Sequence, residues 1–78
     1  MSEYTKKQGQ YLAFIYNYTK INGIPPAETD MQRYFKTTPP TVHQMVLTLE
    51  QHGLIRRKAG QARSIKVLLL PDQLPYLE

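Results

Sequence analysis

The chain has 78 residues, no cysteine and a formal net charge of +4. This length provides a single domain that buries only roughly 60 to 65% of its unfolded surface, and the lack of cysteine excludes disulfides and cysteine-based zinc sites and is compatible with a cytoplasmic protein. There is no hydrophobic signal region, and apolar runs such as residues 67–70 are far below the ~20 residues that span a bilayer, so we expect a soluble protein without a membrane partner.

The first predicted element is a helix from about Lys6 to Ile21. Thr5 followed by Gln8 fits a capping box, and Asn22-Gly23 supplies a stop. Between these ends, apolar side chains recur at helical spacing: Tyr11, Leu12, Phe14, Ile15 and Tyr18. Residues 24–26, Ile-Pro-Pro, cannot continue the helix because proline lacks the amide donor, so we predict a tight extended linker.

A second helix is predicted over Glu28 to Lys36. Glu28 and Asp30 suit the positive end of its dipole, and Met31, Tyr34 and Phe35 are expected to face inward. Only residues 37 and 38 separate this helix from the next one. A connection that short forces a steep crossing angle, which is typical of a helix-turn-helix.

The third helix is predicted to begin near residue 39 and to end before Gly53, which suits a left-handed cap. Thr38 can cap the helix with Pro39 as its first residue. However, a residue that precedes a proline resists the α conformation, so a start at Pro40 is the alternative. Three side chains share the expected core face: Val42, Val46 and Leu49.

Two strands are predicted next, because side chains alternate at Ile55 and Arg57 and again at Ile65, Val67 and Leu69. Between them, residues 58–62 are predicted to form a glycine-containing hairpin loop. Together these elements predict a mostly α protein with a small β-hairpin, namely a winged helix-turn-helix of three helices and a two-stranded wing over residues 1–70. Residues 71–78 are predicted to form a proline-containing apolar tail without regular structure.

A stripe of uncharged side chains lies about a quarter turn from the core face of the third helix. Such a helix fits the major groove of DNA, where glutamine can pair with adenine and Thr or Met can touch a thymine methyl group. A solvated face is the alternative, and we favour base readout with Gln44 as the first candidate and Met45 as the last. The predicted base-reading residues are Thr38, Thr41, Gln44, Met45 and Thr48.

Residues 54–70 carry five basic side chains and no acidic one, which indicates a polyanionic partner. Phosphate contact is favoured over the alternative of ordinary edge-strand charge. Strand alternation predicts that Arg56, Arg57 and Lys58 do not all point the same way. The predicted contacts to the DNA backbone are Lys6, Lys7, Lys36, His43, Arg56, Arg57, Lys58, Gln61 and Arg63, and solvation is an equal alternative for the first two.

No catalytic or metal-binding pattern is present. The two histidines, His43 and His52, have no cysteine or carboxylate cluster beside them, and neither serine has a general base in a motif. We therefore predict no enzyme, no metal, no cofactor and no small-molecule ligand. The six tyrosines could stack on single-stranded bases, but core packing accounts better for Tyr11, Tyr18 and Tyr34.

Residues 41–57 resemble the recognition helix and first wing strand of the LexA family, the self-cleaving repressors of the bacterial SOS response. Four further segments resemble the family in the same order: Thr5-Lys6-Lys7-Gln8, Phe14-Ile15, Gly23-Ile24-Pro25-Pro26 and Arg63-Ser64-Ile65-Lys66-Val67. The resemblance covers roughly residues 5 to 67 and implies sequence-specific binding of double-stranded DNA by a transcriptional repressor.

Two departures limit what the resemblance implies. Pro39-Pro40 stands where the family more often has one proline and a small polar residue, which alters the start of the recognition helix. The family's second domain, which carries the Ser/Lys dyad and the dimer surface, has no room in 78 residues. We therefore expect a small stand-alone regulator without self-cleavage. The alternative is a winged-helix module that docks on protein, with Leu47 in its partner patch.

A single module of this size would bind DNA weakly, so a regulator would normally use two copies on a palindromic site. The apolar tail is the candidate for joining them into a homodimer, through Leu70, Leu74, Tyr76 and Leu77. The equally weighted alternative is that the tail packs against its own domain.

Overall fold

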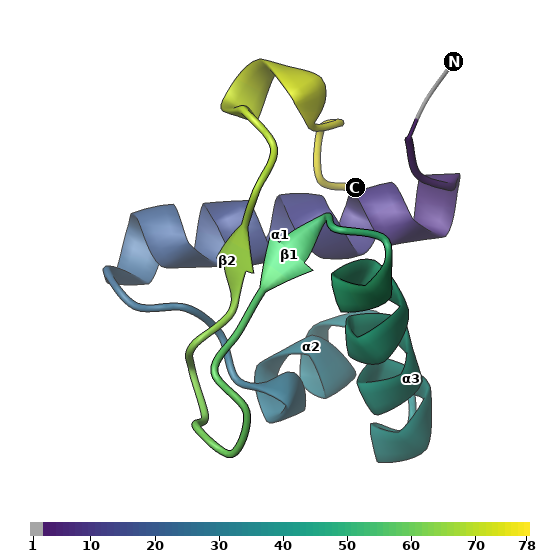
Figure 1. Cartoon of the computed structure of the whole chain (residues 1–78), viewed down its shortest axis with the longest axis vertical. Helices are drawn as coiled ribbons and strands as arrows, with labels where there is room; N and C mark the ends of the chain where they lie inside the picture. Colours follow the sequence, from purple (N-terminus) through teal and green to yellow (C-terminus); the bar gives the residue numbers. More distant parts are fainter. Residues whose placement is uncertain (1–2) are drawn as a thin grey trace.

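The computed structural model describes residues 3–78 as three helices, a two-stranded antiparallel sheet and a short 3-10 turn (Figure 1). The elements in chain order are α1 (Lys6–Asn22), α2 (Glu28–Phe35), α3 (Pro39–Gln51), β1 (Ile55–Arg56), β2 (Lys66–Val67) and η1 (Pro71–Gln73). In Figure 1, α1 crosses the middle of the molecule, α2 and α3 lie below it, and the hairpin runs across it from η1 to a loop at the lower end. The predicted three helices and hairpin are confirmed.

Local hydrogen bonds fix both ends of α1 where the sequence places them. The Thr5 hydroxyl accepts from the Gln8 N–H at 3.1 Å, and the Gln8 side chain accepts from the Thr5 N–H at 2.9 Å, which completes the capping box. Gly23 takes the left-handed conformation, with φ of 77°, and its N–H donates to the Thr19 carbonyl at 2.8 Å. The helix extends one residue beyond the prediction, to Asn22.

The turn between α2 and α3 corrects one predicted boundary and decides between two alternatives for another. Lys36 is not helical but left-handed, with φ of 52°, and this conformation reverses the chain after Phe35. The third helix begins at Pro39, so the alternative start at Pro40 is wrong. Thr38 is extended, which is the conformation that a residue before proline prefers. A backbone N–H at the first two positions of a helix has no acceptor within the helix, so Pro39 and Pro40 remove no helical hydrogen bond there.

The end of α3 passes directly into the hairpin through a Schellman turn. Gly53 has φ of 74°, its N–H donates to the Glu50 carbonyl, and the Leu54 N–H donates to the Leu49 carbonyl, both at 3.0 Å. This geometry folds Leu54 back onto the last helical turn, where it is buried. The predicted cap is therefore confirmed.

The hairpin is shorter in strand and longer in loop than predicted. Strand pairing covers only Ile55 with Val67 and Arg56 with Lys66, so Arg57, Ile65 and Leu69 lie outside the strands. The predicted alternation nevertheless holds at positions 55 and 56, since Ile55 is buried and Arg56 is exposed. The remaining residues, 57–65, form the loop that we call the wing loop.

The core lies between α1, α2, α3 and the base of the hairpin. Leu12, Met31, Val42, Val46 and Leu49 are fully buried, and Ile55 and Ile65 cover them from the hairpin. The Tyr11 and Phe35 rings stack with centroids 4.1 Å apart. Tyr34 was predicted to face inward but is 42% exposed, because its ring packs against the rim of this aromatic cluster and its hydroxyl donates to the Glu78 carbonyl.

The tail packs against its own domain, the second of the two alternatives. Leu74 and Leu77 contact the core, and residues 71–73 form η1, so the prediction of no regular structure is wrong there. The buried Gln10 side chain binds the tail twice, donating to the Tyr76 carbonyl at 2.9 Å and accepting from the Glu78 N–H at 2.8 Å. Two hydrophobic tail residues stay exposed, Leu70 at 64% and Tyr76 at 96%.

No helix within residues 3–78 has the length and apolar character that crossing a membrane requires.

Candidate nucleic-acid interface

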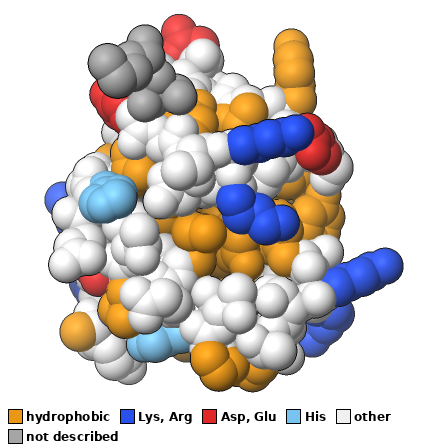
Figure 2. All heavy atoms as spheres, turned by 90° about the vertical axis from the view of Figure 1, so that its right-hand side faces the viewer, with side chains coloured by type: hydrophobic (Ala, Val, Ile, Leu, Met, Phe, Trp, Pro, Cys, Tyr) orange, Lys and Arg blue, Asp and Glu red, His pale blue; other side chains and the backbone are white. Residues whose placement is uncertain are grey.

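Four predicted base-reading residues lie together on the outward side of α3. Val42, Val46 and Leu49 turn one face of the helix fully into the core, so the rest of the helix surface is left to solvent or to a partner. On the side of α3 next to this core face, Thr41, Gln44, Met45 and Thr48 line one shallow groove, which Pro40 and Gln8 complete, and Met45 is half-buried because it also packs against the core. We call these six residues the recognition face. Figure 2 looks onto this side of the molecule and shows mainly uncharged side chains with separate cationic ones between them.

Hydrogen bonds leave Gln44 the most available polar group on the recognition face. The Thr48 hydroxyl donates to the Gln44 carbonyl at 2.9 Å, and the Thr41 hydroxyl lies 2.9 Å from the Thr38 hydroxyl. The Gln44 amide makes no hydrogen bond with any other described residue, and it is exposed. Thr38 itself is exposed at the start of α3 but does not line the groove.

Sequence reasoning missed two members of the recognition face, Pro40 and Gln8. Gln8 belongs to α1, and its side chain was assigned only to the capping box of that helix. Its place beside Met45 depends on how α1 packs on α3, for which the local sequence carries no signal. Pro40 was considered only as a helix start.

The structure divides the predicted backbone contacts into two groups. Five of them already have a partner within the domain: Lys6 with Glu78 at 3.8 Å, Lys7 over the Phe35 ring at 5.4 Å, His43 with Glu28 at 3.2 Å, Arg57 with Glu50 at 3.2 Å, and Arg63 with Asp30 at 3.0 Å. The other four are exposed and form no ion pair with another residue of the range 3–78: Lys36, Arg56, Lys58 and Gln61. A phosphate could therefore bind the three cations of the second group, Lys36, Arg56 and Lys58, without breaking an ion pair among the described residues.

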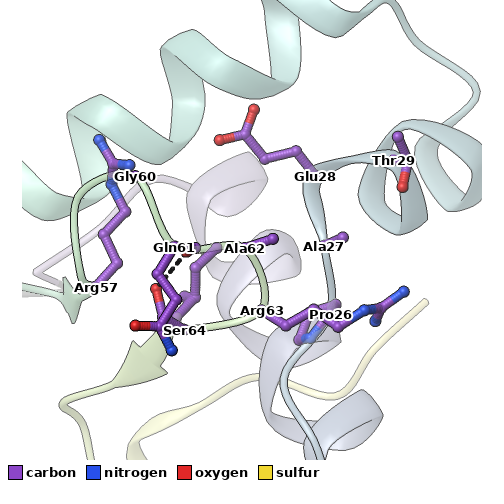
Figure 3. A pocket seen from close by; sticks show the side chains of 11 residues that line it. Pro26, Ala27, Glu28, Thr29, Arg57, Gly60, Gln61, Ala62, Arg63 and Ser64 are labelled. Atoms are coloured by element: carbon purple, nitrogen blue, oxygen red, sulfur yellow. Dashed lines mark hydrogen bonds between the residues drawn. The ribbon is translucent and has the colours of Figure 1, made fainter.

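Arg63 is the backbone candidate that the structure places farthest from the expectation. Its side chain extends from the wing loop past Pro26 toward the linker between α1 and α2 (Figure 3). The guanidinium Nη1 lies 3.0 Å from Asp30 Oδ2 and 3.2 Å from the Tyr18 hydroxyl. Arg63 is thus not brought together with the recognition face.

The charges around this contact support each other. The Ala27 N–H, which donates to Asp30 at 2.8 Å, and then the positive charge of Arg63 hold the pKa of the Asp30 carboxyl below its ordinary value. In turn, the bond to the Tyr18 hydroxyl and the nearby Asp30 charge raise the pKa of Arg63. Both groups are therefore charged in the folded protein at neutral pH.

The wing loop and α3 are placed so that both can approach one partner. In Figure 1 the tip of the wing loop and the N-terminal end of α3 reach the same lower end of the molecule. A cleft of about 300 Å³ separates the wing loop from the start of α2. Within residues 3–78, no three histidine or acidic side chains gather as a metal site would require.

Three helices, a short hairpin after the third helix and an exposed, uncharged face on that helix define a winged helix-turn-helix domain. The family model for the LexA DNA-binding domain matches residues 1–64, and the chain belongs to this family.

Three named relatives agree with the family match. The chain is 39% identical over 71 residues to the LexA repressor of Ruegeria sp. (strain TM1040), covering 90% of this chain and 30% of that protein. It is 39% identical over 72 residues to the LexA repressor of Thermosipho africanus (strain TCF52B), covering 92% and 36%. For the LexA repressor of Bartonella quintana (strain Toulouse) the identity is 34% over 73 residues, covering 92% and 31%. The chain thus spans about a third of the length of these relatives.

Proposed function

We propose that this domain binds double-stranded DNA sequence-specifically and represses transcription, acting in the cytoplasm and sufficient for binding by itself. The observation that carries the proposal is the recognition face on α3, in a domain where Lys36, Arg56 and Lys58 form no ion pair with another residue of the range 3–78. In this arrangement α3 enters the major groove and the wing loop contacts the adjacent backbone. The family match and the LexA repressors among its relatives support the same reading.

Gln44 is the proposed centre of base recognition, because its amide is exposed and makes no hydrogen bond with another residue of the range 3–78. An amide can donate to and accept from the edge of adenine in the major groove, and such a pair contributes about 1 to 3 kcal/mol of discrimination. Gln44→Ala should lose that amount at one base position of a selected binding site, and its binding to random duplex DNA should stay unchanged.

Gln51→Ala is the matched control, because Gln51 is exposed at the end of the same helix but lies outside the recognition face. Affinities can be measured by fluorescence anisotropy on sites obtained by selection from a random duplex pool. An equal loss of affinity for every sequence in the Gln44 variant would contradict base readout.

We further propose that two copies act together on a palindromic site, because one module buries only ~600 to 1,000 Å² of protein surface on DNA. The exposed Leu70 and Tyr76 side chains are the proposed contact between copies, since the rest of the tail is occupied by its own domain. Leu70→Ser with Tyr76→Ser should reduce a dimer to a monomer in analytical ultracentrifugation. A full-length protein that is already monomeric at high concentration would end this part of the proposal.

A protein-docking module is the competing function. Its predicted anchor, Leu47, is only partly exposed, which gives a partner little apolar surface on that side of α3. Retention on heparin or random duplex DNA at low salt distinguishes the two functions, because a docking module of this modest charge need not bind either one.

A further inference from the structure

The backbone of Arg63 is strained in a way that its side-chain contacts explain. Its φ is 56°, in the left-handed region that residues other than glycine rarely occupy. Such a conformation persists where the surrounding structure holds the residue at several points. Here Nη1 lies within 3.4 Å of oxygen atoms from α2, from α1 and from the linker between them, namely those of Asp30, Tyr18 and Pro25.

Asp30 joins this contact to the helix-turn-helix itself. The same carboxylate oxygen that binds Arg63 also accepts the Ala27 N–H at 2.8 Å and so caps the start of α2. The Asp30 side chain is only 13% exposed, which keeps water from competing strongly for it. The wing loop is therefore attached to the element that orients α3.

Little else determines where the tip of the wing loop lies. The two strands at its base pair over only two residues each. The hydrogen bonds of the tip stay within the loop: the Ser64 hydroxyl accepts from the Lys58 N–H at 3.0 Å and donates to the Gln61 carbonyl at 2.8 Å. The cleft seen in Figure 3 separates the tip from the start of α2. Arg57, bound to Glu50 of α3, holds the first side of the loop, and Arg63 holds the second.

We propose that Arg63 is a positioning residue and not a phosphate contact: together with Asp30 it sets the wing tip so that Lys58 meets the DNA backbone. This inference rests on the proposed DNA binding. Lys58 is exposed at the tip and has no ion pair with another described residue. The proposal has an unusual consequence, because neutralising Asp30 should weaken binding to a polyanion, although removing a negative charge would otherwise strengthen it.

The test uses the full chain and a short random-sequence duplex over a range of salt concentrations. Asp30→Asn keeps an oxygen for the Ala27 N–H but loses the charge that binds Arg63. Asp30→Asn and Arg63→Ala should each weaken binding about three- to tenfold and reduce the salt slope by about 0.9, as Lys58→Ala does. In the Lys58→Ala background, Asp30→Asn should cause no further loss of affinity. Arg63→Lys should recover part of the affinity.

Asp72→Asn is the charge-matched control, since Asp72 lies in η1 and has no ion pair with any residue between 3 and 78; it should bind as the unmodified protein does or slightly more tightly. Tighter binding by Asp30→Asn would overturn the proposal. So would a salt slope that falls in Arg63→Ala but not in Asp30→Asn, because that result marks a direct phosphate contact.

A measurement without DNA separates this inference from the proposed function. After thermal unfolding has shown that each variant is folded at the working temperature, ¹⁵N relaxation should report greater motion of residues 58–63 in Asp30→Asn and Arg63→Ala, but not in Asp72→Asn. Unchanged order in the wing loop would refute the positioning role. An unmodified protein that binds no duplex at low salt would instead overturn the proposed function, and the role of Lys58 with it.

Discussion

The salt dependence of DNA binding follows from the number of cations that the fold leaves unpaired. Of the predicted backbone contacts, Lys36, Arg56 and Lys58 form no ion pair within residues 3–78, and Lys7 contacts only an aromatic ring. Four phosphate contacts give a slope of log affinity against log salt of about −3.6, or a loss of about 150-fold between roughly 50 and 200 mM salt. If the paired Lys6, Arg57 and Arg63 also bound phosphate, the slope would approach about −6.

Fluorescence anisotropy with a labelled duplex at five or more salt concentrations measures this slope. Lys58→Ala should make it shallower by about 0.9, whereas Lys20→Ala, which removes an exposed cation outside the predicted interface, should leave it unchanged. A slope near −6 would show that the internal ion pairs open on binding, and a slope near zero would refute the electrostatic reasoning altogether.

Three further predictions concern folding. Leu49→Ala should destabilise the domain by about 2 to 5 kcal/mol in urea unfolding, because Leu49 is fully buried. The control Leu68→Ala should cost far less, because Leu68 is 47% exposed. Equal losses of stability would contradict the described core. Gly53→Ala should cost about 1 to 2 kcal/mol through its left-handed φ alone, since a Cβ there meets no atom within 4 Å, and an unchanged melting temperature would argue against the Schellman turn. Folding lowers the pKa of Asp30, so the stability that its charge contributes is present above the ordinary value of 3.8 and is lost as the pH falls through the lower folded-state pKa. The Asp30→Asn variant should therefore lose less stability than the unmodified protein on acidification below about pH 4. Parallel curves of unfolding free energy against pH would contradict this prediction.

The features that the sequence predicted well are those encoded within a few residues. The capping box at Thr5, the left-handed glycines and the core face of α3 depend on neighbours one to four positions apart, and the structure confirms each of them. The sequence allows two starts for α3, because two local preferences compete there. At Pro39, the preference of proline for the first helical turn outweighed the resistance of a residue that precedes another proline.

Side-chain partners were predicted poorly because they depend on the tertiary fold. Arg63 binds Asp30, which is 33 residues away, and Arg57 binds Glu50 on the preceding helix, so the two arginines are held inside a segment that looks uniformly cationic in the sequence. Gln10 gave no signal either, since a glutamine on a helix is usually solvated. Its role became visible only when the tail was placed beside α1.

The docked tail brings the two ends of the described chain next to each other. The Tyr4 hydroxyl donates to the Gln73 carbonyl, and Lys6 pairs with Glu78. Because residues near the two ends are in contact, a short peptide could join them with little change in the rest of the fold. In the chain-entropy model, closing a ring of this size removes about 4.5 kcal/mol of freedom from the unfolded chain. A backbone-cyclised form should therefore tolerate heat better than the linear one.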